Sequence, residues 1–106
     1  MQLRILLADD HQIVREGIRG ILEREGFEVV GEAATGREAV KMFQEMSPDV
    51  AIFDLDMPIL NGIDAAREIL RASPQMKIIL LTIHIRDHQV VGALRAGVKG
   101  YVLKTQ

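Results

Sequence analysis

Short apolar runs alternate along this chain with segments whose apolar residues have helical spacing. Three of the runs, Arg4–Ala8, 50–53 and 78–81, are too short for helices and apolar at almost every position. Continuous apolarity over about four or five positions is typical of a strand that is covered on both faces, as in a parallel sheet. Two further runs, Glu28–Ala33 and Gly100–Leu103, predict flanking strands.

The segments between these runs predict helices. Gly26 and Gly97 stand where two of the helices would end, since glycine commonly follows the last turn. The order β-α-β-α-β-α-β-α-β predicts an α/β fold with a parallel sheet and right-handed crossovers. A fifth helix would be expected after the last strand, but the sequence stops at Gln106, so we expect the sheet to lack it. The four apolar stripes are Ile13, Gly17, Ile18, Ile21 and Leu22; Ala39, Val40, Phe43 and Met46; Ile63, Ala66, Ile69 and Leu70; and Val90, Val91, Leu94 and Val98.

Composition excludes several classes of function. The 106 residues suit a single domain, and the net charge of −2 argues against an electrostatic nucleic-acid binder, which needs clustered Lys and Arg. The absence of cysteine excludes disulfide scaffolds, cysteine-ligated zinc and thiol catalysis. No apolar run approaches the roughly 18 residues of a membrane span, so we expect a cytoplasmic protein with no membrane partner.

Polar side chains follow four of the predicted strands. The first strand ends in Asp9 and Asp10, the third in Asp54, the fourth in Thr82 and the fifth in Lys104. Because neighbouring parallel strands end at one edge of a sheet, about 5 Å apart, Asp10 and Asp54 can share one ion. Clustered carboxylates repel one another unless a cation intervenes, and oxygen ligands suit Mg²⁺. Lys and Thr suit phosphoryl oxygens, and a carboxylate between them is a potential nucleophile. The set predicts a magnesium-dependent aspartyl-phosphate site.

Each of these residues has an ordinary structural explanation when it is taken alone. Acidic residues before a helix commonly act as caps, as Asp9 and Asp10 would here, and an Asp after a strand is often a turn residue. Thr82 alone is a strand residue, and Lys104 alone is a solvated terminal residue. Their occurrence together at four strand ends is what favours the site.

At these positions the chain resembles the receiver domain of two-component response regulators, the CheY-like family. The resemblance covers essentially the whole chain and implies a flavodoxin-like, doubly wound sheet of five parallel strands in the order 2-1-3-4-5. It is strongest to receivers of LuxR/NarL-type transcriptional regulators, so residues 1–106 are expected to be a receiver domain that stops after its fifth strand, without its output domain. The motifs are Ala8-Asp9-Asp10-His11, Phe53-Asp54-Leu55-Asp56-Met57-Pro58 with Asn61-Gly62, Leu80-Leu81-Thr82, and Ala96-Gly97-Val98-Lys99-Gly100-Tyr101 leading to Val102-Leu103-Lys104.

The resemblance implies a role for each acidic residue. Asp54 would accept a phosphoryl group from the phosphohistidine of a sensor histidine kinase. Mg²⁺ would be bound by Asp9, Asp10, Asp54 and the backbone carbonyl of Asp56, with Asp10 a direct ligand and Asp9 a ligand through water.

The resemblance also implies a switch and a set of partners. Lys104 would bind the phosphoryl oxygens, while Thr82 and Tyr101 would move on phosphorylation and reshape the surface of the fourth helix and fifth strand. Such a change is a shift in population toward a state that already exists. The implied partners are a sensor histidine kinase, DNA through the absent output domain alone, and a second copy of the chain in a phosphorylation-dependent homodimer.

Three residues take the positions that flank the phosphoryl group in this family: Asp56, Ile83 and His84. The bulky Ile83 would slow phosphorylation, and Asp56 adds negative charge beside it. His84 would either position water or point to solvent. The other histidines, His11 and His88, are expected at the surface rather than as ligands.

Two other functions remain open. Residues 53–56 resemble the first motif of haloacid-dehalogenase-type phosphatases, in which one Asp is the nucleophile and the second an acid/base. That motif belongs on the first strand of a longer chain, whereas here it lies on the third. A degenerate receiver that never takes a phosphoryl group would act as an interaction module. We expect a phosphorylated receiver, which is no enzyme apart from self-phosphorylation and self-dephosphorylation of Asp54.

Overall fold

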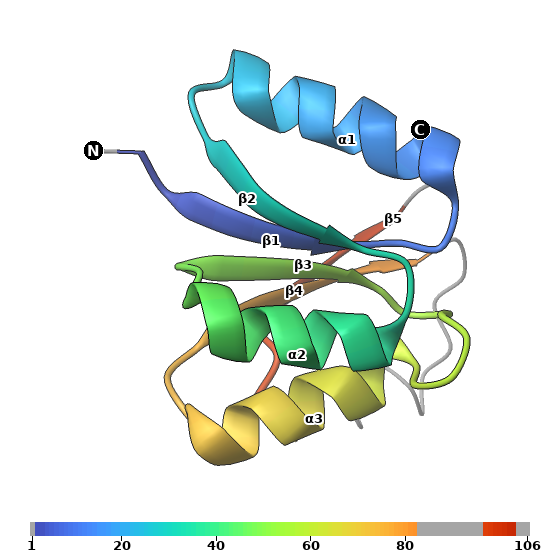
Figure 1. Cartoon of the computed structure of the whole chain (residues 1–106), viewed down its shortest axis with the longest axis vertical. Helices are drawn as coiled ribbons and strands as arrows, with labels where there is room; N and C mark the ends of the chain where they lie inside the picture. The colour runs from blue at the N-terminus through green and yellow to red at the C-terminus, as the bar shows by residue number, and fades with distance from the viewer. Residues whose placement is uncertain (1, 83–96, 104–106) are drawn as a thin grey trace.

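The computed structural model describes residues 2–82 and 97–103, and of Thr82 and 101–103 it describes the backbone only. The described strands form one parallel sheet in the order β2-β1-β3-β4-β5, which confirms the predicted order (Figure 1). The strands are β1 (Arg4–Ala8), β2 (Glu28–Ala33), β3 (Val50–Asp54), β4 (Lys77–Thr82) and β5 (Gly100–Leu103), and the helices are α1 (Gln12–Arg24), α2 (Gly36–Met46) and α3 (Gly62–Ala72).

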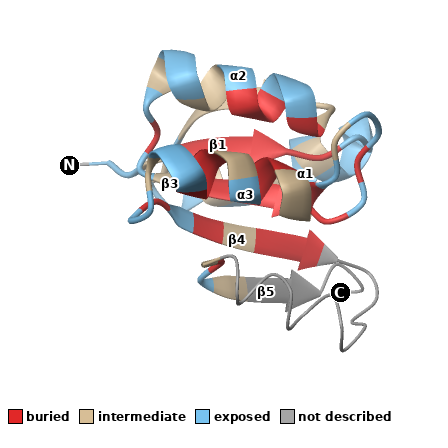
Figure 2. Cartoon of the chain, turned by 90° about the horizontal axis from the view of Figure 1, so that it is seen from below, coloured by how far each residue is buried: buried red, intermediate tan, exposed pale blue. Residues whose placement is uncertain are grey.

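Helices cover the sheet on both faces. α1 packs along β1 and β2 on one face, whereas α2 and α3 lie side by side on the other (Figure 1). Strand β1 serves both layers, because Leu6 and Ala8 belong to the apolar cluster under α2 and α3, while Ile5 and Leu7 belong to the cluster under α1. β1 and β3 are therefore buried almost throughout, and α2 and α3 are buried along one side only, whereas α1 has no fully buried residue (Figure 2). Burial on both faces is the reason for the continuous apolar runs of the two strands.

The predicted apolar stripe of α1 is only partly correct. Ile18 and Leu22 pack against the cluster on the sheet, but Ile13 is 85% and Ile21 53% exposed. At 3.6 residues per turn, Ile13 lies about 140° around the helix from Ile18, so the two cannot face the same sheet. The apolar residues of α1 therefore cover a wider arc of the helix surface than the part of that surface that contacts β1 and β2.

Strand β2 carries one residue more than β1 over the same length. Ile5 of β1 pairs with Val29, but the next residue, Leu6, pairs with Gly31, so Val30 is an extra residue at this irregularity. Because side chains alternate between the faces of a sheet, one extra residue exchanges the faces of every position that follows it. The side chain at position 32 consequently lies on the α1 side of the sheet.

Of the two predicted helix ends, the structure confirms the one at Gly26, and the helix expected before Gly97 lies outside the described residues. Gly26 follows the end of α1 with a φ of 91°, a left-handed conformation that favours glycine. Gly97, with a φ of 102°, lies in a turn before β5. Three members of the fourth predicted stripe, Val90, Val91 and Leu94, lie outside the described residues.

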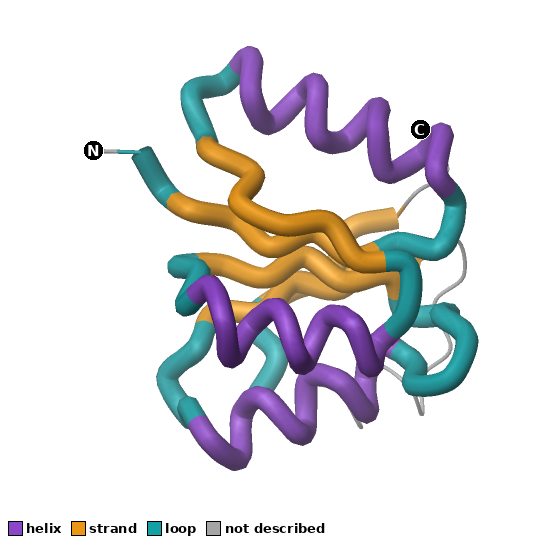
Figure 3. Tube along the Cα trace, viewed as in Figure 1, coloured by secondary structure: helices purple, strands orange, loops and turns teal. Residues whose placement is uncertain are grey.

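The loops that follow β1 and β3 leave the sheet at the same end (Figure 3). β1 and β3 are neighbours and pair in register up to Ala8 and Phe53, so the residues that come next are brought side by side. Among the described helices, none combines the length and the apolar character that a membrane crossing requires.

Candidate functional site

An acidic cluster lies at this end of the sheet. It consists of Asp9 and Asp10, which follow β1, His11, and Asp54, the last residue of β3. Each offers one ligand atom, and these four atoms all lie within 4.8 Å of one another. Asp9 is fully buried and Asp54 is 3% exposed, whereas Asp10 and His11 are open to solvent. The structure thus brings together three of the four predicted metal ligands.

Backbone N–H groups hold the two buried carboxylates in place. The His11 N–H donates to Asp9 Oδ1 at 2.9 Å, and the Asp56 N–H donates to Asp54 Oδ1 at 3.3 Å. In both cases the donor lies two residues after the acid, which is the geometry of an Asx turn. The Asp9 N–H itself donates to the Ala33 carbonyl of β2 at 3.0 Å. These hydrogen bonds fix the orientation of both carboxylates at the ends of their strands.

Two glycines clamp the loop that follows Asp54. A Cβ atom on Gly62 would lie 2.2 Å from the Asp54 carbonyl oxygen, and one on Gly36 would lie 1.9 Å from the Leu60 carbonyl oxygen. Both distances are far below van der Waals contact and involve backbone atoms, so only glycine fits. The start of α3 therefore rests directly on the backbone of Asp54, and the start of α2 rests on the loop that follows it.

The acidic cluster fits a hard divalent cation. Buried carboxylates held so close repel one another, and a divalent cation offsets that repulsion. Carboxylate oxygens are the donors that Mg²⁺ prefers, and it commonly keeps several waters, for which the exposed side of Asp10 leaves room. The described residues therefore fit Mg²⁺ by number and type of donor.

The remaining predicted site residues are described only in part. Asp56 is exposed, and its side chain lies outside the acidic cluster. Thr82 ends β4, where its backbone pairs with Leu103 of β5, and the Tyr101 backbone pairs with Leu80. The positions of Lys104, Ile83 and His84 lie outside the described residues.

Two contacts at the site were not predicted from the sequence. His11 is exposed, as expected, yet its Nδ1 lies 3.4 Å from Asp9 Oδ1 and 3.2 Å from Asp10 Oδ1. Its position directly after two aspartates was the available signal. Arg15 donates from Nη1 to the Asp9 carbonyl at 2.7 Å. No local pattern marks this residue, because it lies six positions from Asp9, on a helix whose spacing indicates only an apolar side.

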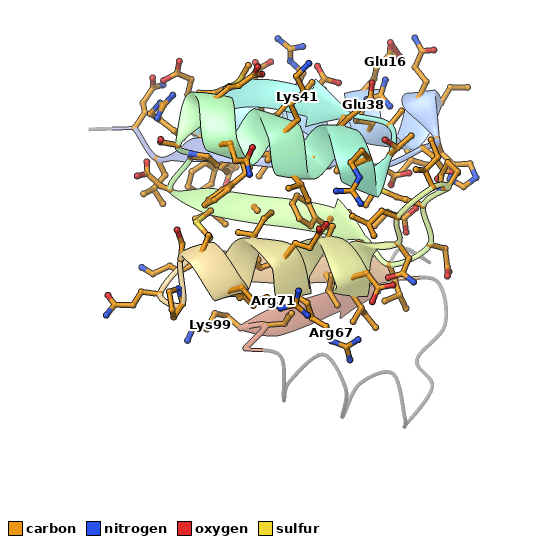
Figure 4. The ribbon with its side chains drawn as sticks, turned by 60° about the horizontal axis from the view of Figure 1, so that its bottom comes forward. Glu16, Glu38, Lys41, Arg67, Arg71 and Lys99 are labelled. Atoms are coloured by element: carbon orange, nitrogen blue, oxygen red, sulfur yellow. The ribbon has the colours of Figure 1, made fainter. Side chains whose placement is uncertain are left out.

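A groove between α2 and α3 contrasts with the acidic cluster. It encloses about 320 Å³, and the ion pair between Arg37 and Glu68, 3.3 Å apart, spans the two helices. Lys41 of α2 and Arg71 of α3 also line it (Figure 4). Glu68 is the one acidic residue among those that line it, so it has no comparable concentration of ligand atoms.

Comparison with known proteins gives a consistent result. The family model of the response regulator receiver domain matches residues 5–106. Response regulator protein VraR of Staphylococcus epidermidis is 42% identical over 106 residues, which cover 99% of this chain and 51% of VraR. Chemotaxis protein CheY of Thermotoga maritima is 39% identical over 104 residues, or 98% of this chain and 87% of CheY. A LuxR-family two-component response regulator from an Aurantimonas species superposes with a TM-score of 0.94 at 40% identity, over 100% of this chain and 76% of that one.

These matches agree with the geometry described above. The chain spans about half the length of VraR, so the match concerns one part of that relative. The strand order, the acidic cluster and the family match together define a signalling module of the two-component type. The chain belongs to the response regulator receiver domain family.

Proposed function

We propose that this receiver takes a phosphoryl group on Asp54 from the phosphohistidine of a sensor histidine kinase, in a Mg²⁺-dependent reaction. The observation that carries the proposal is the position of Asp54, which is buried at the end of β3 with ligand atoms of Asp9 and Asp10 within 4.8 Å. A carboxylate beside a cation site, at the edge where parallel strands end, is suited to phosphoryl chemistry.

The transfer exchanges one covalent bond for another. A carboxylate oxygen of Asp54 attacks the phosphorus, the P–N bond to the kinase imidazole breaks, and its electron pair returns to the ring nitrogen. Asp9, Asp10, Asp54 and the backbone carbonyl of Asp56 are the residues that would hold Mg²⁺. The bound ion would neutralise the charge that builds up between carboxylate and phosphoryl oxygens.

The chain's own groups orient the nucleophile. The hydrogen bond from the Asp56 N–H fixes the Asp54 carboxylate, and the contact of Gly62 with the Asp54 carbonyl fixes its backbone. In the sheet, the end of β4 at Thr82 lies beside Leu103 of β5, the residue before Lys104. This adjacency supports roles for Lys104 in binding the phosphoryl oxygens and for Thr82 and Tyr101 in the switch. Asp56, Ile83 and His84 would flank the group and set its lifetime.

The consequence of phosphorylation lies in a second part of the protein. The resemblance to LuxR/NarL-type regulators, together with the half-length match to VraR, supports a DNA-binding output domain whose activity the receiver controls. We place this exchange in the cytoplasm and expect phosphorylation to favour a homodimer. Self-phosphorylation and self-dephosphorylation of Asp54 would be its only chemistry.

The decisive experiment is intact-protein mass spectrometry after incubation with acetyl phosphate. We expect a single phosphoryl adduct that forms with Mg²⁺, is absent with EDTA, and is lost in Asp54→Ala. Asp56→Asn is the matched control, because this acid lies two residues away and outside the acidic cluster. It should still be labelled.

Other outcomes identify the alternatives. Labelling that persists in Asp54→Ala would overturn the site assignment. Steady release of phosphate that stops in Asp56→Asn would indicate a phosphatase of the haloacid-dehalogenase type. No adduct in the wild-type chain would indicate a degenerate receiver that acts as an interaction module.

A further inference from the structure

A network of charged side chains joins α1 to β2 beside the acidic cluster. The Glu32 carboxylate lies between two arginines of α1: Arg15 donates from Nε to Oε1 at 3.1 Å, and Arg19 donates from Nη1 to Oε2. Arg19 also donates to Glu23 at 3.2 Å. The carboxylates of Glu23 and Glu32 raise the pKa of Arg19 above its ordinary value, so its guanidinium stays charged.

The extra residue in β2 is what makes this network possible. With regular alternation after Val29, position 32 would lie on the side of α2 and α3. The irregularity at Val30 exchanges the faces, so Glu32 pairs with Leu7 and shares its α1-facing side. The extra residue therefore places the Glu32 carboxylate against Arg15 and Arg19 of α1.

Arg15 connects this network to the metal site. Its Nη1 donates to the Asp9 carbonyl at 2.7 Å while its Nε remains paired with Glu32. The Arg15 side chain is 17% and that of Glu32 22% exposed, so the link is largely screened from solvent. The Asp9 N–H donates to Ala33 of β2. Both backbone polar groups of Asp9 are thus held from β2, one directly and one through Arg15.

We infer that Arg15 is a positioning residue that fixes the Asp9–Asp10 segment and thereby preorganises the Mg²⁺ site. The inference rests on the proposed function, in which Asp9 and Asp10 hold the ion. Groups that orient metal ligands from outside the coordination sphere commonly change metal affinity when they are removed. Arg15 would act through the peptide that joins the two aspartates, without touching the ion.

The sign of the effect separates positioning from simple electrostatics. A guanidinium near the cluster repels a cation, so removal of its charge would tighten Mg²⁺ binding if Coulomb forces alone mattered. Loss of the hydrogen bond to the Asp9 carbonyl would instead loosen the ligands and weaken binding. The two explanations predict opposite changes for Arg15→Ala.

Isothermal titration of the metal-free protein with MgCl₂ measures this difference. We expect Arg15→Ala to bind Mg²⁺ about tenfold more weakly than the wild type. The matched control is Arg19→Ala, which removes the other arginine from the same Glu32 but whose partners, Glu23 and Glu32, lie outside the acidic cluster. It should bind Mg²⁺ like the wild type. Unchanged or tighter binding in Arg15→Ala would overturn the inference.

Arg15→Lys is a second variant, which keeps the positive charge and, unlike Arg15→Ala, keeps most of the volume of the side chain. A single ammonium cannot span Glu32 and the Asp9 carbonyl as the planar guanidinium does. We therefore expect weaker Mg²⁺ binding in Arg15→Lys as well, and wild-type affinity in this variant would contradict the linking role.

Amide hydrogen exchange of the metal-free protein tests the positioning without the ion. Exchange over residues 9–14 should be faster in Arg15→Ala than in Arg19→Ala, and equal rates would refute the inference. If the wild-type chain binds no Mg²⁺, the proposed function fails, while the exchange rates still decide whether Arg15 holds this segment.

Discussion

Ile59 has a backbone conformation that branched residues rarely adopt. Its φ is 71°, and the Leu60 N–H donates across it to the Pro58 carbonyl at 2.7 Å, which closes a three-residue turn. Such a conformation costs a β-branched residue on the order of 1–3 kcal/mol. The side chain is 82% exposed, so little packing offsets this cost.

Replacement of Ile59 by glycine should therefore stabilise the protein. We expect Ile59→Gly to raise the free energy of unfolding by about 1 kcal/mol, measured by urea denaturation without Mg²⁺. Ile59→Ala is the control, because it removes the same exposed side chain but keeps the Cβ that disfavours positive φ. Equal stability of the two variants would show that the backbone of this turn is not strained.

At the same scale, the sequence predicted the acids of the site but not the residues that hold them. Asp9, Asp10 and Asp54 could be placed because each follows a recognisable strand, and strand ends meet at one edge. The contact of Arg15 with the Asp9 carbonyl depends on which way a helix is turned, and on a bulge in β2. Neither feature has a local signature in the sequence.

The helices begin in two different ways. α2 begins with a capping box, in which Thr35 Oγ1 accepts from the Glu38 N–H at 3.1 Å and Glu38 Oε1 accepts from the Ala34 N–H at 2.9 Å. α3 is capped by Asn61, which accepts from the Asp64 N–H at 2.9 Å. α1 has no side-chain cap, and the acidic cluster lies at its N-terminus instead. The positive end of its helix dipole therefore favours negative charge at the site.

Removal of the α2 cap should cost stability without affecting the site. We expect Thr35→Ala to lower the free energy of unfolding by about 1 kcal/mol, as measured by chemical denaturation. Thr35→Ser keeps the hydroxyl and should lose much less. Acetyl phosphate labelling of the folded Thr35→Ala protein should match that of the wild type, and a large loss of labelling would mean that the start of α2 takes part in the chemistry.

The bounds of strands that are covered on both faces were predicted well, whereas the buried face of a helix that is covered on one side was predicted less well. Continuous apolar runs located β1, β3 and β4 within a residue or so of their ends, because strands covered on both faces leave little ambiguity. On α1 the same kind of reasoning assigned Ile13 and Ile21 to the core, although both are exposed. Apolar spacing indicates a helix, but it does not say how wide an arc the neighbouring sheet covers.

For the molecule as a whole, the proposed binding of Mg²⁺ at the acidic cluster would link stability to divalent cations. An ion that binds only the folded chain stabilises it, by about 2.7 kcal/mol at a hundredfold excess over the dissociation constant. In the absence of the ion, repulsion among Asp9, Asp10 and Asp54 opposes folding. Metal-free and metal-loaded protein should therefore differ in thermal stability.

Asp10→Asn should change which protein is more stable, the variant or the wild type, between EDTA and Mg²⁺. We expect the variant to be more stable than the wild type in EDTA, by up to about 1 kcal/mol, because one of the crowded charges is gone. In Mg²⁺ the order should invert, since the variant lacks a ligand. Thermal melting in both buffers measures the two effects, and a variant that gains as much from Mg²⁺ as the wild type would exclude Asp10 as a ligand.

The two glycines at the starts of α2 and α3 also limit how this sequence can evolve. Any side chain at position 36 or 62 would overlap a backbone carbonyl of the loop after Asp54. Between the Asp54 and Leu60 carbonyls, the side chains of Pro58 and Ile59 are exposed to solvent. Substitutions at the exposed tip of the loop therefore disturb no packing, while its two contacts with the glycines stay fixed. New recognition can thus arise beside the acidic cluster without a change in the two helix starts that hold the loop.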